Sequence, residues 1–108
     1  MKVNELINKL SLTTLCEGDT ERECTGCYSG DLLSWVMSRA KDGDIWLTVM
    51  GNINAVAVAV LTDCACIVLT ENSALDEEAK QRADMQGVTI LRSEKNAYEL
   101  SGLISQLL

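Results

Sequence analysis

The chain has 108 residues and a formal net charge of −7, because 16 acidic side chains outnumber 9 basic ones and histidine is absent. This length suits one domain, and 47% hydrophobic residues without phenylalanine or proline predict an aliphatic core and no proline-rich linker. Charge and composition speak against two function classes. The excess of acidic residues, with basic residues scattered along the chain, disfavours nucleic-acid binding. No apolar run approaches the ~20 residues that span a membrane.

The N-terminal part of the chain predicts one helix and two extended segments. In MKVNELINKL, polar residues interrupt the apolar stretch that a signal peptide requires, so we expect a cytoplasmic protein. The apolar residues of 3–10 have helical spacing instead, which predicts an amphipathic helix. Residues 12–16 (LTTLC) have strand-type composition, residues 17–23 (EGDTERE) form an acidic turn, and residues 24–30 (CTGCYSG) are extended.

A second helix is predicted over 32–40 (LLSWVMSRA), with Asp31 as its N-cap residue. Leu32, Trp35 and Val36 share one face at helical spacing, so we expect this face to be buried. The sequence KDGD at 41–44 then ends the helix in a turn. Both tryptophans, Trp35 and Trp46, are interpreted as core residues or as anchors of a dimer interface.

The remaining chain alternates between strand and helix patterns. Strand-type runs occupy 45–50, 64–70 and 88–93, and helical patterns occupy 71–87 and 96–108. We expect Ser73 to cap the first of these helices, Gly87 to end it, and Tyr98 in the second to be half-buried. The alternation predicts an α/β fold: a single domain over 1–108 with a mostly parallel sheet and helices on both faces.

The segment GNINAVAVAVLTD at 51–63 is ambiguous, because valine favours strands. If 45–50 and 64–70 are parallel neighbours, however, the chain between them must cross over, and such a crossover is usually a helix. We therefore predict a helix over 52–63, with Ala55 and Ala59 forming a flat strip that permits close packing.

No catalytic constellation is present. The absence of histidine excludes Ser-His-Asp and Cys-His catalysis, and the sequence contains neither G-x-x-x-x-G-K-[ST] nor G-x-G-x-x-G. We therefore expect no catalytic residue, no cofactor and no enzymatic activity.

Five cysteines leave two interpretations open. Cys24 and Cys27 form a C-x-x-C, Cys64 and Cys66 form a C-x-C, and Cys16 stands alone. The favoured interpretation is that they are small buried hydrophobic residues in a reducing compartment, without a metal. The alternative is that Cys24, Cys27, Cys64 and Cys66 hold zinc or an iron–sulfur cluster, although Cys64 and Cys66 would share one face of a strand while Cys24 and Cys27 would not. The acidic turn does not match a calcium loop either.

Ligands of open α/β sheets bind outside the carboxyl ends of the strands, where helix N-termini present free N–H groups. In this chain those ends hold polar residues that either serve only as caps and turns or also contact a ligand. We expect a small anionic metabolite such as an adenine nucleotide here. The ligand-binding candidates are Thr48, Gly51, Asn52, Asn54 and Ser93.

Several short segments together resemble the small stand-alone DRTGG-domain proteins of anaerobic bacteria. The matching residues are Gly26 and Tyr28, DLLS at 31–34, WLT at 46–48, NAVA at 54–57, and the later Glu78-Ala79, Gly87-Val88 and Tyr98-Glu99. The motif that names the family is echoed at 21–27 (ERECTGC), where Cys27 replaces the usual second glycine. The resemblance covers essentially the whole chain.

The resemblance implies an α/β domain similar to the non-catalytic N-terminal region of HPr kinase/phosphorylase. It implies a regulatory or small-ligand sensing role linked to anaerobic energy metabolism. We also expect a homodimer, because a 108-residue domain with a small-residue helix strip, two tryptophans and a strongly apolar final helix has surface to cover. Two alternatives remain: a cysteine-based metal or iron–sulfur accessory protein whose partner is a redox enzyme such as iron-only hydrogenase, and an adaptor that binds only other proteins.

Overall fold

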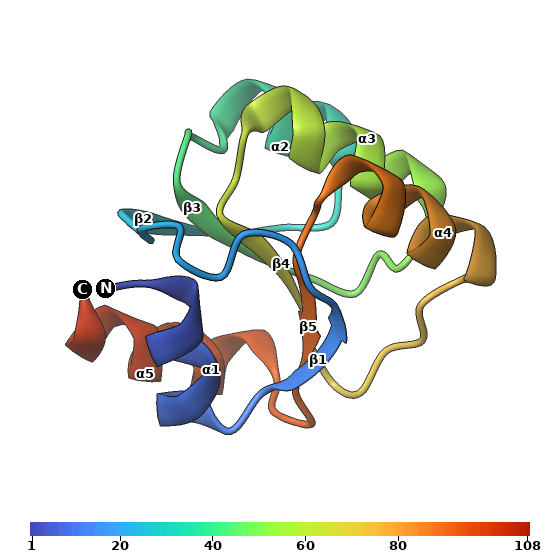
Figure 1. Cartoon of the computed structure of the whole chain (residues 1–108). Helices are drawn as coiled ribbons and strands as arrows, with labels where there is room; N and C mark the ends of the chain where they lie inside the picture. Colours follow the sequence, from blue (N-terminus) through green and yellow to red (C-terminus); the bar gives the residue numbers. More distant parts are fainter.

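One five-stranded sheet, in the order β1-β5-β4-β3-β2, organises the computed structural model, which describes residues 1–108 (Figure 1). Four neighbouring strands are parallel, and the edge strand β1 pairs antiparallel with β5. The strands are β1 (Thr13–Cys16), β2 (Gly26–Ser29), β3 (Asp44–Thr48), β4 (Cys66–Leu69) and β5 (Ile90–Arg92). The predicted α/β class and mostly parallel sheet are confirmed.

Helices cover both faces of this sheet, as predicted. One face carries α1 (Val3–Leu10) and α5 (Ala97–Leu107), and the other carries α2 (Leu33–Arg39), α3 (Ile53–Thr62) and α4 (Glu77–Gln86) (Figure 1). None of the five is long and apolar enough to cross a bilayer.

Alternation along the central strands divides the buried residues into two cores. In β3, Ile45 and Leu47 belong to the core beneath α1 and α5, whereas Trp46 belongs to the core beneath α2, α3 and α4. Strand β4 alternates in the same way, with Val68 on the first side and Ile67 on the second. Because every residue of these two strands is buried, both faces of the sheet centre are covered.

The valine-rich segment at 53–62 is a helix, and alanines explain why. Ala55 and Ala59 of α3 lie in the same buried cluster as Ala79 and Ala83 of α4, and all four side chains are at most 3% exposed. Small side chains on both helices permit close approach, so tertiary packing overrides the strand preference of valine. Of the two roles left open for Asn52, the structure shows the helix cap, because its side-chain oxygen accepts a hydrogen bond from the Ala55 amide.

The predicted start of α2 was wrong by one residue. Asp31 does not cap this helix; its carboxylate accepts hydrogen bonds from the Thr48 hydroxyl at 2.8 Å and the Val49 amide at 2.9 Å. The position before α2 is occupied by Leu32, which makes no side-chain cap. Asp31 thus ties the chain before α2 to the carboxyl end of β3.

The predicted buried face of α2 was also wrong in part. Val36 is fully buried, but Leu32 is 61% exposed and Trp35 is 53% exposed. Leu33 and Ala40 pack against the core beside Val36 instead. These three positions have helical spacing too, so periodicity alone does not decide which stripe is buried. Trp46 is a core residue, whereas Trp35 stacks on Arg39 at the surface.

Helix α4 begins at Glu77, after a longer loop than predicted. Ser73 does not cap it, because the Ser73 hydroxyl donates to the Thr70 carbonyl, and Asp76 occupies the N-cap position. Gly87 ends the helix as predicted, with a positive φ of 70° that suits glycine.

The predicted half-burial of Tyr98 was wrong, since the residue is 87% exposed. Helix α5 buries Leu100 and Ile104 on its inner face, and Tyr98 lies outside that stripe.

Candidate functional site

Two of the residues expected to bind a ligand use their side chains inside the protein. The Thr48 hydroxyl donates to Asp31, accepts from the Met50 amide at 3.2 Å, and is buried. The Asn52 side-chain oxygen accepts from the Ala55 amide at 2.9 Å. Both residues therefore shape the turn after β3.

Gly51 leaves room for another part of the chain. A Cβ atom at this position would overlap the Ala74 carbonyl oxygen and lie 3.0 Å from the Leu75 Cα atom. The Gly51 carbonyl also accepts a hydrogen bond from the Asp76 amide at 2.8 Å. Glycine is thus required at position 51 because the loop before α4 packs directly against its backbone.

Asn54 and Ser93 are the candidates with side chains still available. Asn54 is exposed in the first turn of α3 and its side chain has no partner within the chain. The Ser93 hydroxyl accepts from the Lys95 amide at 3.1 Å, which leaves its proton free to donate. The two do not meet as closely as expected, because β4 lies between β3 and β5 in the sheet. The carboxyl edge thus offers two separate polar areas.

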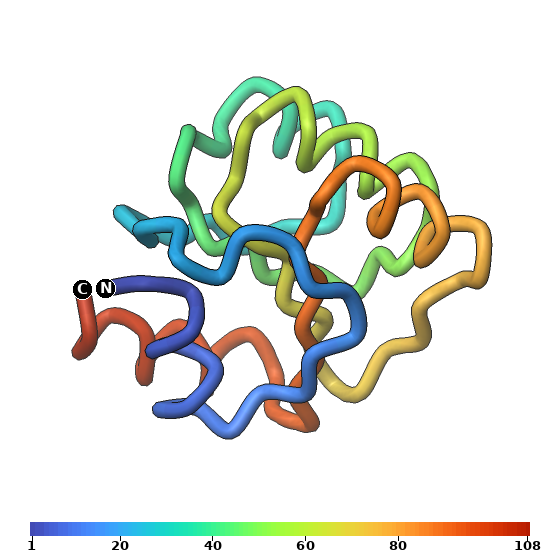
Figure 2. Tube along the Cα trace, viewed as in Figure 1, coloured from blue at the N-terminus to red at the C-terminus, as the bar shows by residue number.

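A hollow of about 310 Å³ opens beside Ser93, and we call it the basic hollow. It lies where three connecting segments gather: the link from α1 to β1, the loop after β4 and the loop after β5 (blue, gold and orange-red in the lower part of Figure 2). Leu10 is its single hydrophobic residue and Glu94 its single carboxylate. The other lining residues are Ser11, Thr13, Asn72, Arg92, Ser93 and Lys95.

Backbone hydrogen bonds fix the walls of the basic hollow. The Glu71 amide donates to the Lys95 carbonyl at 2.9 Å, and the Asn72 amide donates to the Ser93 carbonyl at 2.8 Å. The Ser93 amide in turn donates to the Leu69 carbonyl at 2.9 Å. Glu71, Asn72 and Ser11 also adopt the left-handed conformation, with φ of 54°, 58° and 53°. These conformations are uncommon outside glycine, so the surrounding bonds must hold this shape.

Most polar side chains of the basic hollow have no partner within the protein, and Ser93 only accepts a hydrogen bond from the Lys95 amide. Neither Arg92 nor Lys95 forms an ion pair, and no side-chain hydrogen bond engages Ser11, Thr13 or Asn72. A positively charged, donor-rich hollow is suited to hold an anion. Of this group, only Ser93 was a predicted ligand-binding residue, because no local sequence pattern links 11–13 with 92–95.

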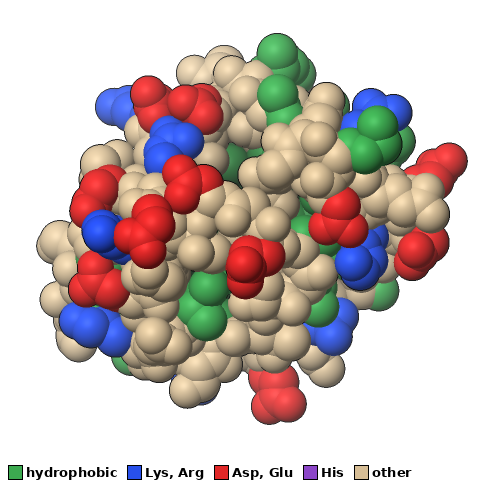
Figure 3. Space-filling model, in the orientation of Figure 1, with side chains coloured by type: hydrophobic (Ala, Val, Ile, Leu, Met, Phe, Trp, Pro, Cys, Tyr) green, Lys and Arg blue, Asp and Glu red, His purple; other side chains and the backbone are tan.

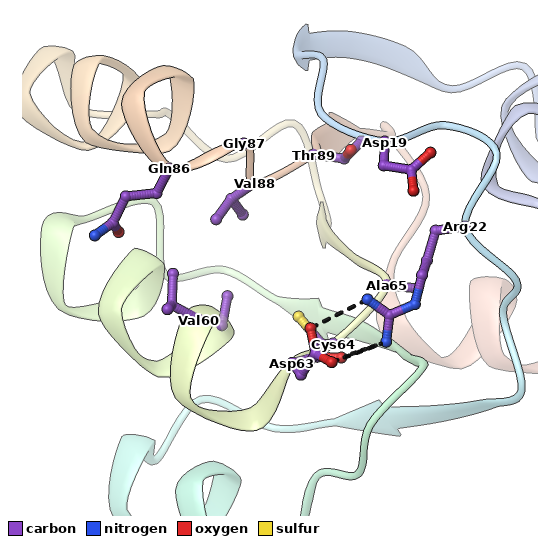
Figure 4. Close-up of a pocket in the computed structure, with 11 residues that line it drawn as sticks. Asp19, Arg22, Val60, Asp63, Cys64, Ala65, Gln86, Gly87, Val88 and Thr89 are labelled. Carbon is purple, nitrogen blue, oxygen red and sulfur yellow. Dashed lines mark hydrogen bonds and ion pairs between the residues drawn. The ribbon is translucent and has the colours of Figure 1, made fainter.

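A second hollow, of about 140 Å³, lies at the opposite edge of the sheet, near the ends of α3 and α4 (Figure 4). Arg22 reaches into it and donates to the Asp63 carboxylate at 3.1 Å and the Asp63 carbonyl at 2.9 Å. It also pairs with Asp42. The hydrogen bond that Arg22 donates to the Asp63 carboxylate raises the pKa of Arg22. Two carboxylates thus neutralise the Arg22 cation. Its ion pair with Asp63 ties the long loop after β1 to the end of α3.

The acidic turn is part of a network of ion pairs. Glu21 pairs with Lys2 at 2.8 Å and Glu23 with the terminal amine at 3.0 Å. Figure 3 shows acidic and basic side chains interspersed over the side of the molecule where β2 and both termini lie. These carboxylates face cations of the same chain, as expected for a surface turn.

The Thr25-Gly26 part of the family motif supports the turn before β3. The Thr25 hydroxyl donates to the Asp42 carbonyl at 3.3 Å. A Cβ atom on Gly26 would lie 2.6 Å from an Asp44 carboxylate oxygen. Asp44 is buried and accepts from the Lys41 amide at 2.8 Å. This motif therefore seats β2 against the 41–44 turn.

The cysteines are dispersed between the two cores and the surface. Cys24 and Cys66 are buried in the core beneath α1 and α5, Cys16 and Cys64 lie on the other side, and Cys27 is exposed on β2. The expectation that Cys64 and Cys66 share a face was wrong, because Cys64 precedes β4. No group of three or more Cys, Asp or Glu side chains is placed to hold a metal ion.

Most of the thiols are poor nucleophiles. Burial raises the pKa of Cys16 to about 11 and that of Cys64 to about 12. Contact with Cys24 and full burial raise the pKa of Cys66. Packing around the Cys27 sulfur raises its pKa to about 11, although part of the residue is exposed. Protonated thiols of this kind react slowly and bind metals weakly.

Comparison with known proteins identifies relatives of the whole domain. A family model described as the DRTGG domain matches residues 5–107. Among solved structures, the chain is similar to the CBS and DRTGG domains of the regulatory region of Clostridium perfringens pyrophosphatase, complexed with its activator diadenosine tetraphosphate. The TM-score is 0.73 at 13% identity, over 99% of this chain and 47% of that one. Comparison with curated proteins gives no match.

Proposed function

Because the chain belongs to the DRTGG-domain family, we propose that it is a non-catalytic regulatory domain that binds a small anionic ligand, with an adenine nucleotide as first candidate. The observation that carries this proposal is the shared fold over 99% of the chain with part of a regulatory region that was complexed with an adenine dinucleotide activator. The chain spans about half of that region, so the transfer of ligand class to this domain alone is part of the proposal.

The carboxyl edge of the sheet is the proposed ligand region. Asn54 and Ser93 offer free donors there, whereas Thr48, Gly51 and Asn52 form the framework of the turn after β3. Ligands of open α/β sheets bind at this edge because helix N-termini and loops meet there. The net charge of −7 opposes an anion, so we expect modest affinity that weakens as salt rises.

The experiment is a titration of the whole protein with ATP, followed by calorimetry and by amide NMR shifts. We expect saturable binding, with shifts confined to the carboxyl edge of the sheet, where the loops after β3, β4 and β5 and the start of β1 lie. Labelled ATP incubated with the protein and candidate acceptor proteins should show no phosphate transfer, because the chain has no histidine and no phosphate loop. Transfer that follows the pure protein would refute a non-catalytic role, and no binding at millimolar nucleotide would refute nucleotide sensing.

We further propose that the protein acts as a homodimer in anaerobic energy metabolism. Exposed apolar side chains support association: Leu32 just before α2, Trp35 on α2 and Leu61 near the end of α3 are each more than half exposed. Sedimentation at micromolar concentration should give twice the 11.8 kDa chain mass. A clean monomer at high concentration would contradict the dimer.

A further inference from the structure

We propose that the basic hollow binds the phosphate chain of a polyphosphate ligand, and that the adenine base of a nucleotide remains outside it. This inference rests on the proposed function and deepens it, since it names which part of the carboxyl edge contacts the ligand and which part of the ligand is bound there.

The first argument is the supply of charge and donors. Arg92 and Lys95 are free of ion pairs in a chain where acidic residues predominate. The pairing of β1 with β5 places Thr13 opposite Arg92, and both residues line the hollow. Guanidinium and ammonium groups form short, charge-assisted hydrogen bonds with phosphate oxygens. The single opposing carboxylate, Glu94, leaves the lining with a net positive charge.

The second argument is preorganisation. The Asn72 amide donates to the Ser93 carbonyl, and the Glu71 amide donates to the Lys95 carbonyl, so the two loops form one wall. Because these bonds hold the two loops against each other, little backbone ordering is needed on binding.

The third argument is size and polarity. A volume of about 310 Å³ lies at the lower end of the ~300–1,000 Å³ typical of small-molecule sites. Leu10 is the only hydrophobic lining residue, so an adenine ring would find no apolar surface to cover it. Phosphate groups therefore match the hollow, and a base does not.

The test is calorimetric titration of the whole protein at low salt with two probes, inorganic tripolyphosphate and ATP. Four proteins are compared: the natural chain, Arg92→Gln, Lys95→Gln and the control Arg82→Gln. Arg82 carries the same charge on α4, is exposed, and does not line the hollow. Circular dichroism verifies that each variant is folded. If Arg92→Gln is unstable, Lys95→Gln still tests the proposal, because Lys95 is exposed.

We expect tripolyphosphate to bind nearly as tightly as ATP, and each hollow variant to weaken both about tenfold, as for loss of one charge-assisted hydrogen bond. Arg82→Gln should change affinity less than about twofold, by long-range charge alone. Amide shifts should concentrate at 11–13, 72 and 92–95.

Three results would overturn the inference. The first is that tripolyphosphate does not bind at millimolar concentration. The second is that Arg82→Gln loses as much affinity as the hollow variants, which indicates unspecific charge attraction. The third is ATP binding that both hollow variants retain, which places the nucleotide elsewhere and leaves the regulatory function standing. Conversely, tripolyphosphate binding without ATP binding would keep the phosphate site and remove the nucleotide from the proposed function.

Discussion

Replacement of Gly51 by alanine should destabilise the protein, and the structure gives the magnitude. The new methyl group would overlap the Ala74 carbonyl oxygen, and both Ala74 C and Leu75 Cα would lie 3.0 Å away. These are backbone atoms, so the loop before α4 must move. Overpacking of this kind costs about 1–3 kcal/mol. The shift also strains the hydrogen bond from the Asp76 amide to the Gly51 carbonyl, which adds about 1 kcal/mol.

The expected loss is therefore about 2–4 kcal/mol of unfolding free energy. Gly102→Ala is the matched control, because a Cβ atom at Gly102 has nothing within 4 Å and the residue lies inside α5. Alanine there should stabilise by up to about 1 kcal/mol, through helix propensity. Urea unfolding can be followed by fluorescence, since Trp46 is fully buried in the native state. If Gly51→Ala matches the natural chain within about 0.5 kcal/mol, the packing argument fails, and a ligand-contact role for Gly51 becomes the better explanation.

Two further predictions concern a helix cap and a buried thiol. Asn52→Ala should cost about 1 kcal/mol of unfolding free energy, because the cap of α3 is lost. The control Asn54→Ala, two residues later, should be nearly neutral in the same urea experiment. Equal losses in the two variants would contradict the role of Asn52 as a cap. Burial raises the pKa of the Cys16 thiol from about 9 to about 11, so the thiol loses its proton at lower pH in the unfolded chain than in the folded one. The neutral thiol therefore contributes stability below pH 9, and this contribution is lost as the pH rises from about 9 to 11. The natural chain should lose stability over this range more steeply than Cys16→Ala, by up to about 1.4 kcal/mol per pH unit, and parallel curves would refute the assignment.

The sequence predicted the elements well where periodicity and caps agreed. Helix α1 begins where expected, and α3 and α5 each begin one residue after the predicted start. Asn52 and Asn96 each accept a hydrogen bond from an amide of the first turn. Errors arose where polar side chains had two partners available. Asp31 bonds to the end of β3 and Ser73 bonds to Thr70, so neither caps the helix that follows it in sequence. Short-range preference could not rank these alternatives, because one partner depends on tertiary structure.

The basic hollow was beyond prediction because it depends on the direction of one edge strand. An antiparallel strand begins where its parallel neighbour ends, so β1 starts at the carboxyl edge of the sheet, with Thr13 opposite Arg92. This pairing brings the end of α1 and the hydroxyls of Ser11 and Thr13 against a loop about 80 residues later in the chain. A parallel β1 would place these groups at the opposite edge and leave Arg92 and Lys95 in open solvent. The strand that departs from the parallel pattern is therefore the one that closes the hollow.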